Sequence, residues 1–403
     1  MKGKNKHAQN KEKITLYPGM AGMTRDIVTR LKAEGARLLS LDIMLTQKCN
    51  FRCNYCYAEG SPEKKNELLM KEVKQIVEEA LELGVRIVNM QGGEPLIWHP
   101  ADWDGKAGEA YFHIVEHIRN RFQDENKPLD LVSFTDVALI TRQKAKILAG
   151  LNMALCCKLD SLDPKIQDSL LGVPGGLSKM MQGYEHLISV GYGNKDMPPL
   201  STNTVVTTVN YDGIEDVFRW SRSRGFRPFV IPVHVHGRAQ SNSDIMLSGQ
   251  KTKSTLSPLD IKKLFEKLAK IDREEFNIIW EPKTPWIENK ACSRHLGGVH
   301  IRADGIVVPC SEAPDFWALG DIRKQSLKEI ISSPKVEKFR QIYSNLHEDS
   351  KCSPKRCEMA AQFKCYGCRT RAYDDSAFDK KGTYDVKRLD PQAFFAGDPA
   401  CWL

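Results

Sequence analysis

The chain of 403 residues has a net charge of +8, with 27% charged and 41% hydrophobic residues, as in an ordinary globular protein. No apolar run approaches the ~20 residues that cross a bilayer, and the N-terminus lacks the apolar segment of a secretory signal. We therefore expect a cytoplasmic protein with no membrane partner. Residues 2–13 hold five lysines against one glutamate. This tail carries about half of the positive excess, so the charge does not indicate a nucleic-acid partner.

Twelve cysteines are the most informative feature of the composition. In a reducing compartment, clustered cysteines indicate metal binding or catalysis more often than disulfides. They form a triplet at 49, 53 and 56, an adjacent pair at 156 and 157, and a group of seven between 292 and 401. This distribution predicts two metal-bearing regions.

Residues 1–37 are expected to form a basic tail and a short helical approach. Strand-like apolar runs then alternate with amphipathic helical stretches, which is typical of βαβ units and a parallel sheet. Strands are predicted near 38–46, 85–91, 129–136, 153–161, 200–209 and 227–236, and helices near 68–83, 110–122, 142–150, 177–190 and 213–224. Six units are too few for a closed eight-stranded barrel. The predicted fold is α/β, an open, partial (β/α)6 TIM-like barrel over residues 38–240.

The alternation ends after Arg238. Residues 241–281 are expected to be a bridging region with a helix near 258–272 and a strand near 276–280. Residues 282–403 are expected to form a small cysteine-rich α+β domain with one hairpin, at 299–309, and one helix, at 326–344. Its last 50 residues have few long apolar runs, so metal clusters are the natural means of stabilising it.

The first cysteine group reads Cys49-Asn-Phe-Arg-Cys53-Asn-Tyr-Cys56 and directly follows the first predicted strand. Three thiolates on one short loop can bind three corners of a [4Fe–4S] cluster and leave the fourth iron open. Loops at this end of barrel strands also build active sites. A structural zinc site or an ordinary surface loop is the alternative.

A second motif, Gln91-Gly92-Gly93-Glu94-Pro95, ends the second predicted strand. Two glycines allow a ligand to approach the backbone closely, and a carboxylate can receive an ammonium group. Alone, such a sequence is often only a turn that ends a strand. One βα unit after the cysteine loop, it is far more specific.

Together the two motifs resemble those of the radical S-adenosylmethionine (SAM) family. The resemblance implies that Cys49, Cys53 and Cys56 ligate the catalytic cluster, whose open iron binds the amino and carboxylate groups of SAM. It implies that Tyr55 lies beside the adenine, and that Gly92, Gly93 and Glu94 hold the amino group. By the same resemblance, four polar residues of strands four and five are candidate SAM contacts: Lys158, Asp160, Ser201 and Asn203.

Alternation along strand four places Cys156, Lys158 and Asp160 on one face and Cys157 on the other. Both cysteines are therefore expected to be buried structural thiols. His234 and His236 share a face at the end of strand six. They either line a substrate pocket or form a structural pair at the domain junction whose hydrogen bonds are satisfied within the protein.

The third cysteine group resembles a SPASM domain, which binds two auxiliary [4Fe–4S] clusters. Its spacing departs from the common form, and one or two zinc knuckles are the alternative. By order in the motif, one set would hold the outer cluster: Cys352, Cys357, Cys365 and Cys401. Cys292, Cys310 and Cys368 would hold the inner cluster, whose fourth position is open or filled by a residue such as His295.

The resemblance implies an oxidoreductase or maturase that cleaves SAM reductively to a 5′-deoxyadenosyl radical and takes a hydrogen atom from its substrate. The net oxidation would modify a peptide, by a crosslink or similar bond, or a small metabolite such as a sugar, an amino acid or a tetrapyrrole. The electron is expected from a donor such as flavodoxin or ferredoxin. The remaining alternative is a non-enzymatic metal-binding protein, against which the Gly-Gly-Glu motif argues.

Overall fold

The computed structural model describes residues 25–242, 256–290, 294, 297–341, 350–362, 365, 367–377 and 385–403. Within them, nine strands form one sheet in the order β6-β5-β4-β3-β2-β1-β7-β8-β9, with β6 and β9 at its two edges. The bounds are β1 Ser40–Met44, β2 Ile87–Gln91, β3 Asp130–Thr135, β4 Ala154–Lys158, β5 Leu200–Val206, β6 Arg227–Pro232, β7 Gly298–Ile301, β8 Ile306–Val308 and β9 Gly320–Asp321. All pairs from β6 to β7 are parallel, whereas β8 and β9 add antiparallel strands.

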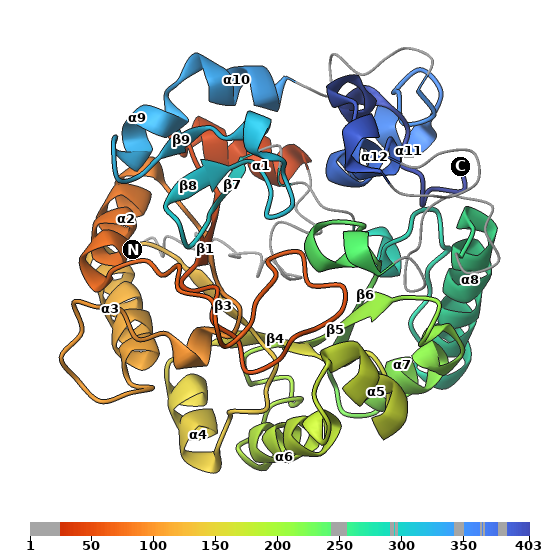
Figure 1. The fold of residues 1–403 in the computed structure, drawn as a ribbon, viewed down its shortest axis with the longest axis horizontal. Helices are drawn as coiled ribbons and strands as arrows, with labels where there is room; N and C mark the ends of the chain where they lie inside the picture. Colours follow the sequence, from red (N-terminus) through yellow and green to blue (C-terminus); the bar gives the residue numbers. More distant parts are fainter. Residues whose placement is uncertain are drawn as a thin grey trace, which may run out of the picture.

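The helices stand outside the strands, and α2 to α8 surround the curved sheet, with α6 between α4 and α5 (Figure 1). Those before the polar stretch are α1 Arg25–Ala33, α2 Met70–Leu83, α3 Ala110–Asp124, α4 Arg142–Gly150, α5 Pro164–Leu171, α6 Gly176–Ser189 and α7 Ile214–Arg222. After it come α8 Pro258–Glu275, α9 Leu327–Ile331, α10 Pro334–Arg340, α11 Glu358–Ala361 and α12 Arg369–Asp375. No described helix is long and apolar enough to cross a membrane.

The predicted α/β fold with an open, partial barrel is confirmed. Each of the six predicted strands is present, although β6 ends at Pro232, so that His234 and His236 follow the strand. Strands β1 and β2 are buried along their whole length, as expected of parallel strands covered on both faces. The predicted hairpin is also present, and Gly305 turns it at a φ of +89°.

Three secondary-structure predictions need correction. The segment at 276–280 forms no strand, because Asn277 adopts a φ of +55° directly after α8. The single helix predicted at 326–344 is two short helices, and α10 begins at Pro334, which cannot continue α9. Residues 342–344 lie outside the described part. Helix α5 was missed, although Asp163 and Pro164 form its N-terminal cap.

A buried ion pair joins α7 to α8, the first helix after the six βα units. Arg222 donates two hydrogen bonds of 2.8 Å to the carboxylate of Asp272 and one of 3.1 Å to Glu288. Trp280 donates to the same Asp272 carboxylate at 2.9 Å. The Asp272 side chain is fully buried, so it depends on these donors for its charge.

We predict that Arg222→Ala lowers the free energy of unfolding by about 3–5 kcal/mol, because Asp272 then remains buried and uncompensated. Arg219→Ala is the matched control, since Arg219 pairs with Glu275 on the exposed face of the same helices. It should cost at most about 1 kcal/mol. Denaturant titration of the anaerobic protein measures both, and equal losses would contradict the prediction.

Candidate active site

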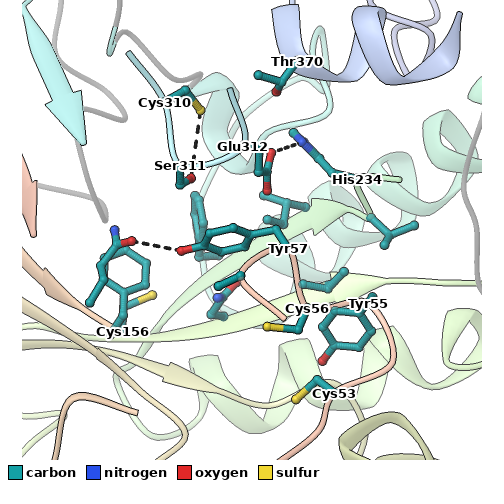
Figure 2. A pocket seen from close by; sticks show the side chains of 18 of the residues that line it. Cys53, Tyr55, Cys56, Tyr57, Cys156, His234, Cys310, Ser311, Glu312 and Thr370 are labelled. Carbon is teal, nitrogen blue, oxygen red and sulfur yellow. Dashed lines mark hydrogen bonds and ion pairs between the residues drawn. The ribbon is translucent and has the colours of Figure 1, made fainter. Parts of the chain in front are cut away.

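A cavity of about 340 Å³ opens at the carboxyl ends of the barrel strands. Figure 2 looks into it, with Cys53, Tyr55 and Cys56 on one side and Cys310 and Thr370 on the other. Its barrel wall includes Cys49, Cys53, Tyr55, Cys56, Gly92, Gly93, Thr135, Asp136, Lys158 and Asn203. Its C-terminal wall includes Cys310, Ser311, Glu312, Cys365, Cys368 and Thr370. Two cysteine groups far apart in sequence thus border one space.

The cysteine loop between β1 and α2 is held by the segment that follows β6. The Arg238 guanidinium donates to the carbonyl oxygens of Cys53, at 2.7 Å, and Gly60, at 2.9 Å. The backbone amide of Arg238 donates to the carbonyl oxygen of Cys56 at 3.1 Å. The Asn242 side chain donates to the carbonyl of Asn54 at 2.8 Å. These bonds fix the backbone of the loop, so its thiols are positioned by the far edge of the barrel.

The buried thiols of this loop need a metal to carry their charge. Burial, and then the charge of Asp136, raises the pKa of the Cys49 thiol; burial, and then the charge of Cys56, raises the pKa of the Cys53 thiol. Such thiols ionise readily only when a metal replaces the proton. Soft thiolates suit iron–sulfur or zinc rather than a harder metal.

The Gly-Gly turn packs against the cysteine loop. The amides of Gly93 and Glu94 donate to the carbonyl oxygens of Thr46, at 2.6 Å, and Lys48, at 2.8 Å. A Cβ atom at Gly93 would lie 2.1 Å from the Lys48 oxygen, so only glycine fits there. Both glycines also line the cavity. The turn therefore couples the position of the loop to the shape of the cavity.

Glu94 itself is turned into the protein. Its side chain is fully buried, and it is absent from the described residues that line the cavity. The Thr135 hydroxyl lies 2.8 and 3.0 Å from the two carboxylate oxygens and donates to them. In addition, Oε1 accepts from the Leu96 amide at 3.0 Å, and Oε2 accepts from the Asp136 amide at 2.8 Å. The carboxylate thus ties the end of β2 to the end of β3.

Tyr55, Lys158 and Asp160 form one cluster at the end of β4. The Tyr55 hydroxyl donates to Asp160, and Lys158 Nζ lies 2.9 Å from Asp160 Oδ1 and 4.4 Å from the centre of the Tyr55 ring. Tyr55 and Lys158 line the cavity, whereas Asp160 is fully buried behind them and also accepts from the Val205 amide. Through these contacts Asp160 orients the side chains of Tyr55 and Lys158 at the cavity wall.

The remaining candidates of β4 and β5 divide between the cavity and the core. Asn203 lines the cavity, and its Oδ1 is buried without a donor among the described residues. Ser201 is buried and absent from the described lining. Cys156 lines the cavity and Cys157 packs in the core, so the two buried thiols do point to opposite faces.

His234 meets both descriptions considered for it, since it lines the cavity and is fully partnered. Its Nδ1 pairs with Glu312 (Figure 2). Arg371 Nη2 lies 2.8 Å from its Nε2. Arg371 in turn pairs with Asp398 at 3.0 Å. His236 lies 3.4 Å from Asp374. The histidine periodicity was the only sequence signal for this network, because its acidic and basic partners lie 78 or more residues away.

The described C-terminal cysteines fall into two places. The Asp398 amide donates to the Cys352 sulfur at 3.3 Å, and the Gly367 amide donates to the Cys365 sulfur at 3.4 Å. Burial is the main cause that raises the pKa of the Cys365 thiol, and the charges of Cys401 and Cys352 raise it further. Cys357 packs beside Cys365. The second place holds Cys310 and Cys368, and Cys368 lies 3.7 Å from His234 Nε2. Both border the cavity, as Cys365 of the first place also does. Cys292 and His295 lie outside the described residues.

An open α/β barrel with a cysteine loop, a Gly-Gly turn and a second cysteine group over the same cavity defines a cluster-dependent enzyme. Residues 43–221 match the model of the Radical SAM superfamily, and residues 292–358 match that of the iron–sulfur cluster-binding domain named SPASM. The chain is a radical SAM enzyme with a SPASM-type C-terminal domain, and its cofactors are [4Fe–4S] clusters and SAM.

Three curated relatives show the range of similarity. A probable GTP 3′,8-cyclase of Methanococcus aeolicus is 25% identical over 67% of this chain and 84% of its own length. An AdoMet-dependent heme synthase of Methanosarcina barkeri is 25% identical over 82% of this chain and 90% of its own. The subtilosin biosynthesis protein AlbA of Bacillus subtilis is 24% identical over 93% of this chain and 76% of its own.

Two solved structures share the fold. The anSMEcpe protein, with bound AdoMet and the Cp18Cys peptide, has a TM-score of 0.61 at 20% identity and covers 88% of this chain and 95% of its own. SuiB of Streptococcus suis, bound to the precursor peptide SuiA, has a TM-score of 0.61 at 16% identity and covers 93% of this chain and 79% of its own.

We predict that Arg238→Met weakens retention of the cluster at Cys49, Cys53 and Cys56, because the loop loses two backbone hydrogen bonds. In the presence of an iron chelator, this variant should lose the irons of that cluster, about four per chain, faster than the wild type does. Arg52→Ala is the control, since Arg52 is on the same loop but pairs with exposed Glu63. Equal rates of iron loss in Arg238→Met and the wild type would show that the hydrogen bonds from the Arg238 side chain are not needed to retain the cluster.

Proposed function

We propose that this enzyme uses SAM radical chemistry for a net oxidative modification of a peptide. The observation that carries the proposal is the single cavity bordered by the barrel cysteines and by Cys310 and Cys368. A substrate in that cavity has the SAM-binding wall on one side and the C-terminal cysteines on the other.

When bound, the cluster of the barrel and SAM supply methionine and a 5′-deoxyadenosyl radical, which takes a hydrogen atom from the substrate and becomes 5′-deoxyadenosine. The chain has to place the target carbon and to keep water away. Cys49, Cys53 and Cys56 would hold the cluster, and Tyr55, Lys158 and Asn203 would border SAM. Cys310 and Cys368 belong to the inner auxiliary group, which would accept the second electron of the oxidation.

The outer auxiliary cluster would use Cys352, Cys357, Cys365 and Cys401, and the inner one Cys292, Cys310 and Cys368. The buried thiols of Cys352 and Cys365 support the first assignment. An electron donor such as flavodoxin or ferredoxin, in a cytoplasmic setting, completes the proposal.

Aromatic residues form much of the cavity wall between the two cysteine groups. Tyr57 lies in the middle of the view, between Cys56 and Glu312, and its hydroxyl donates to Gln91 at 3.2 Å (Figure 2). Phe229 and Trp286 also line the cavity, with ring centroids 6.1 Å apart. Such a wall suits an apolar or aromatic side chain presented by an extended peptide.

Each candidate substrate class has support from a part of the comparisons. AlbA is named for the biosynthesis of a bacteriocin, and both solved neighbours were obtained with peptides. The second candidate, the same chemistry on a small metabolite, is favoured by the GTP cyclase and heme synthase relatives.

The test begins with anaerobic purification and iron and sulfide analysis, where three cubane clusters give about twelve irons per chain. With dithionite and SAM, the wild type should release 5′-deoxyadenosine, and Cys53→Ala should release none. Cys157→Ala is the control, because Cys157 is a buried thiol of the core, outside the predicted ligand sets and the described cavity lining. It should retain iron and cleavage activity.

Cleavage of SAM by Cys53→Ala would overturn the assignment of the catalytic cluster. For the substrate class, the enzyme is incubated with candidate precursor peptides encoded beside its gene and with GTP. A peptide that loses two mass units, with one deoxyadenosine per event, supports peptide oxidation. Turnover of GTP alone would favour the second candidate.

A further inference from the structure

Thr370 lies between the cavity and a predicted ligand of the inner auxiliary cluster. It lines the cavity on the same side as Cys310 (Figure 2). Its side chain is buried, and its Oγ1 atom lies 3.2 Å from the sulfur of Cys368. A hydroxyl group this close to a cysteine sulfur forms a hydrogen bond with it.

The direction of this hydrogen bond follows from the chemistry of a cluster ligand. A cysteine that ligates iron is a thiolate, which has no proton to donate. The Thr370 hydroxyl must then be the donor and the Cys368 sulfur the acceptor. Cys368 directly precedes helix α12, and Thr370 is the second residue of that helix. The helix backbone therefore holds the hydroxyl and the sulfur close together.

The nitrogen atoms of His234 do not replace this donor. The Cys368 sulfur lies 3.7 Å from Nε2 and 3.9 Å from Nδ1. Because these distances are nearly equal, the sulfur cannot lie along the hydrogen-bonding direction of either nitrogen. The two nitrogens meet Arg371 and Glu312 instead. Of the hydrogen-bonding groups described around the Cys368 sulfur, the Thr370 hydroxyl is the nearest.

Ser311 offers a comparison on the same wall of the cavity. It also lines the cavity and follows a predicted ligand of the inner cluster, Cys310. The Ser311 Oγ atom, however, lies 4.0 Å from the Cys310 sulfur, so this contact is much weaker than the contact between Thr370 and Cys368.

We propose that the Thr370 hydroxyl donates a hydrogen bond to the Cys368 thiolate and thereby raises the reduction potential of the inner auxiliary cluster. Reduction adds negative charge to the cluster, and a hydrogen bond donated to a ligating sulfur stabilises that charge. This inference rests on the proposed function, in which the inner cluster takes up the second electron of the oxidation. In that step the substrate radical loses one electron to the cluster and releases a proton to water.

The test measures the midpoint potential of the inner cluster in anaerobic, cluster-loaded protein, by redox titration followed with electron paramagnetic resonance (EPR). The signal of the inner cluster is the one that changes in Cys368→Ala. Thr370→Val replaces the hydroxyl by a methyl group of similar size. It should shift the one-electron reduction equilibrium about tenfold toward the oxidised cluster, a potential lower by about 59 mV.

Two variants serve as controls. Thr370→Ser keeps a hydroxyl group and should keep the wild-type potential. Ser311→Ala removes the distant hydroxyl of the same wall and should also leave the potential unchanged. If Thr370→Val fails to load iron, Thr370→Ala takes its place with the same expected shift.

A second readout detects the hydrogen bond itself. Electron nuclear double resonance of the reduced inner cluster should show, in the wild type and in Thr370→Ser, a proton coupling that is lost in D2O and is missing from Thr370→Val. A Thr370→Val variant with the wild-type potential and the same exchangeable coupling would overturn the proposal. If Cys368→Ala instead leaves the EPR spectrum and the iron content unchanged, Cys368 holds no cluster, and the ligand set of the proposed function is wrong.

Discussion

The parallel pairing of β1 with β7 is the constraint on which the site depends. It aligns Ser40 with Gly298 and Ile43 with Ile301, and so extends the barrel sheet into the C-terminal part of the chain. Because parallel strands end at one edge of a sheet, the turn between β7 and β8 lies at the edge where the cysteine loop leaves β1. β8 then runs back antiparallel, and the segment that follows it, with Cys310 and Ser311, borders the cavity. A substrate cavity between two cysteine groups is a consequence of this one register.

The charges around the cavity follow from the same arrangement. On β1, the buried Asp42 accepts from Asn89 at 2.8 Å and Gln91 at 2.9 Å and pairs with Arg294 from the C-terminal part. Burial tends to raise the pKa of Asp42, but Arg294, His300 and Asn89 together outweigh burial and lower the pKa, which keeps the carboxyl ionised. Both walls of the cavity thus share buried ionic contacts, and each one needs the other to satisfy its charges.

The sequence predicted most of the barrel because its signals are local. Strand runs such as Ile87–Gln91 are apolar and bounded by turn residues, and the cysteine and glycine motifs are short. The motifs could not indicate that Glu94 would be taken up by Thr135 and the Asp136 amide, because those contacts cross 41 and 42 residues. In the sequence, Arg238 marked only the point where the alternation ends, and its contact with the loop at Cys53 spans 185 residues.

The C-terminal part was harder to predict for a physical reason. Its helices are short and its apolar runs few, so its elements are set by turns, prolines and long-range pairs rather than by periodicity. The split at Pro334 and the absence of a strand at 276–280 are of this kind. The network of His234, Glu312 and Arg371 has no sequence signature beyond the spacing of the two histidines, because it exists only once the segment after β6 and the C-terminal segment meet.

The most direct measurement is a structure of the anaerobically loaded enzyme with SAM bound. We expect a [4Fe–4S] cluster on Cys49, Cys53 and Cys56, SAM in the same cavity with its methionine part at that cluster, and metal held by Cys310 and Cys368 across the cavity. Zinc at the cysteine loop, or SAM bound outside this cavity, would contradict the mechanism proposed for the protein.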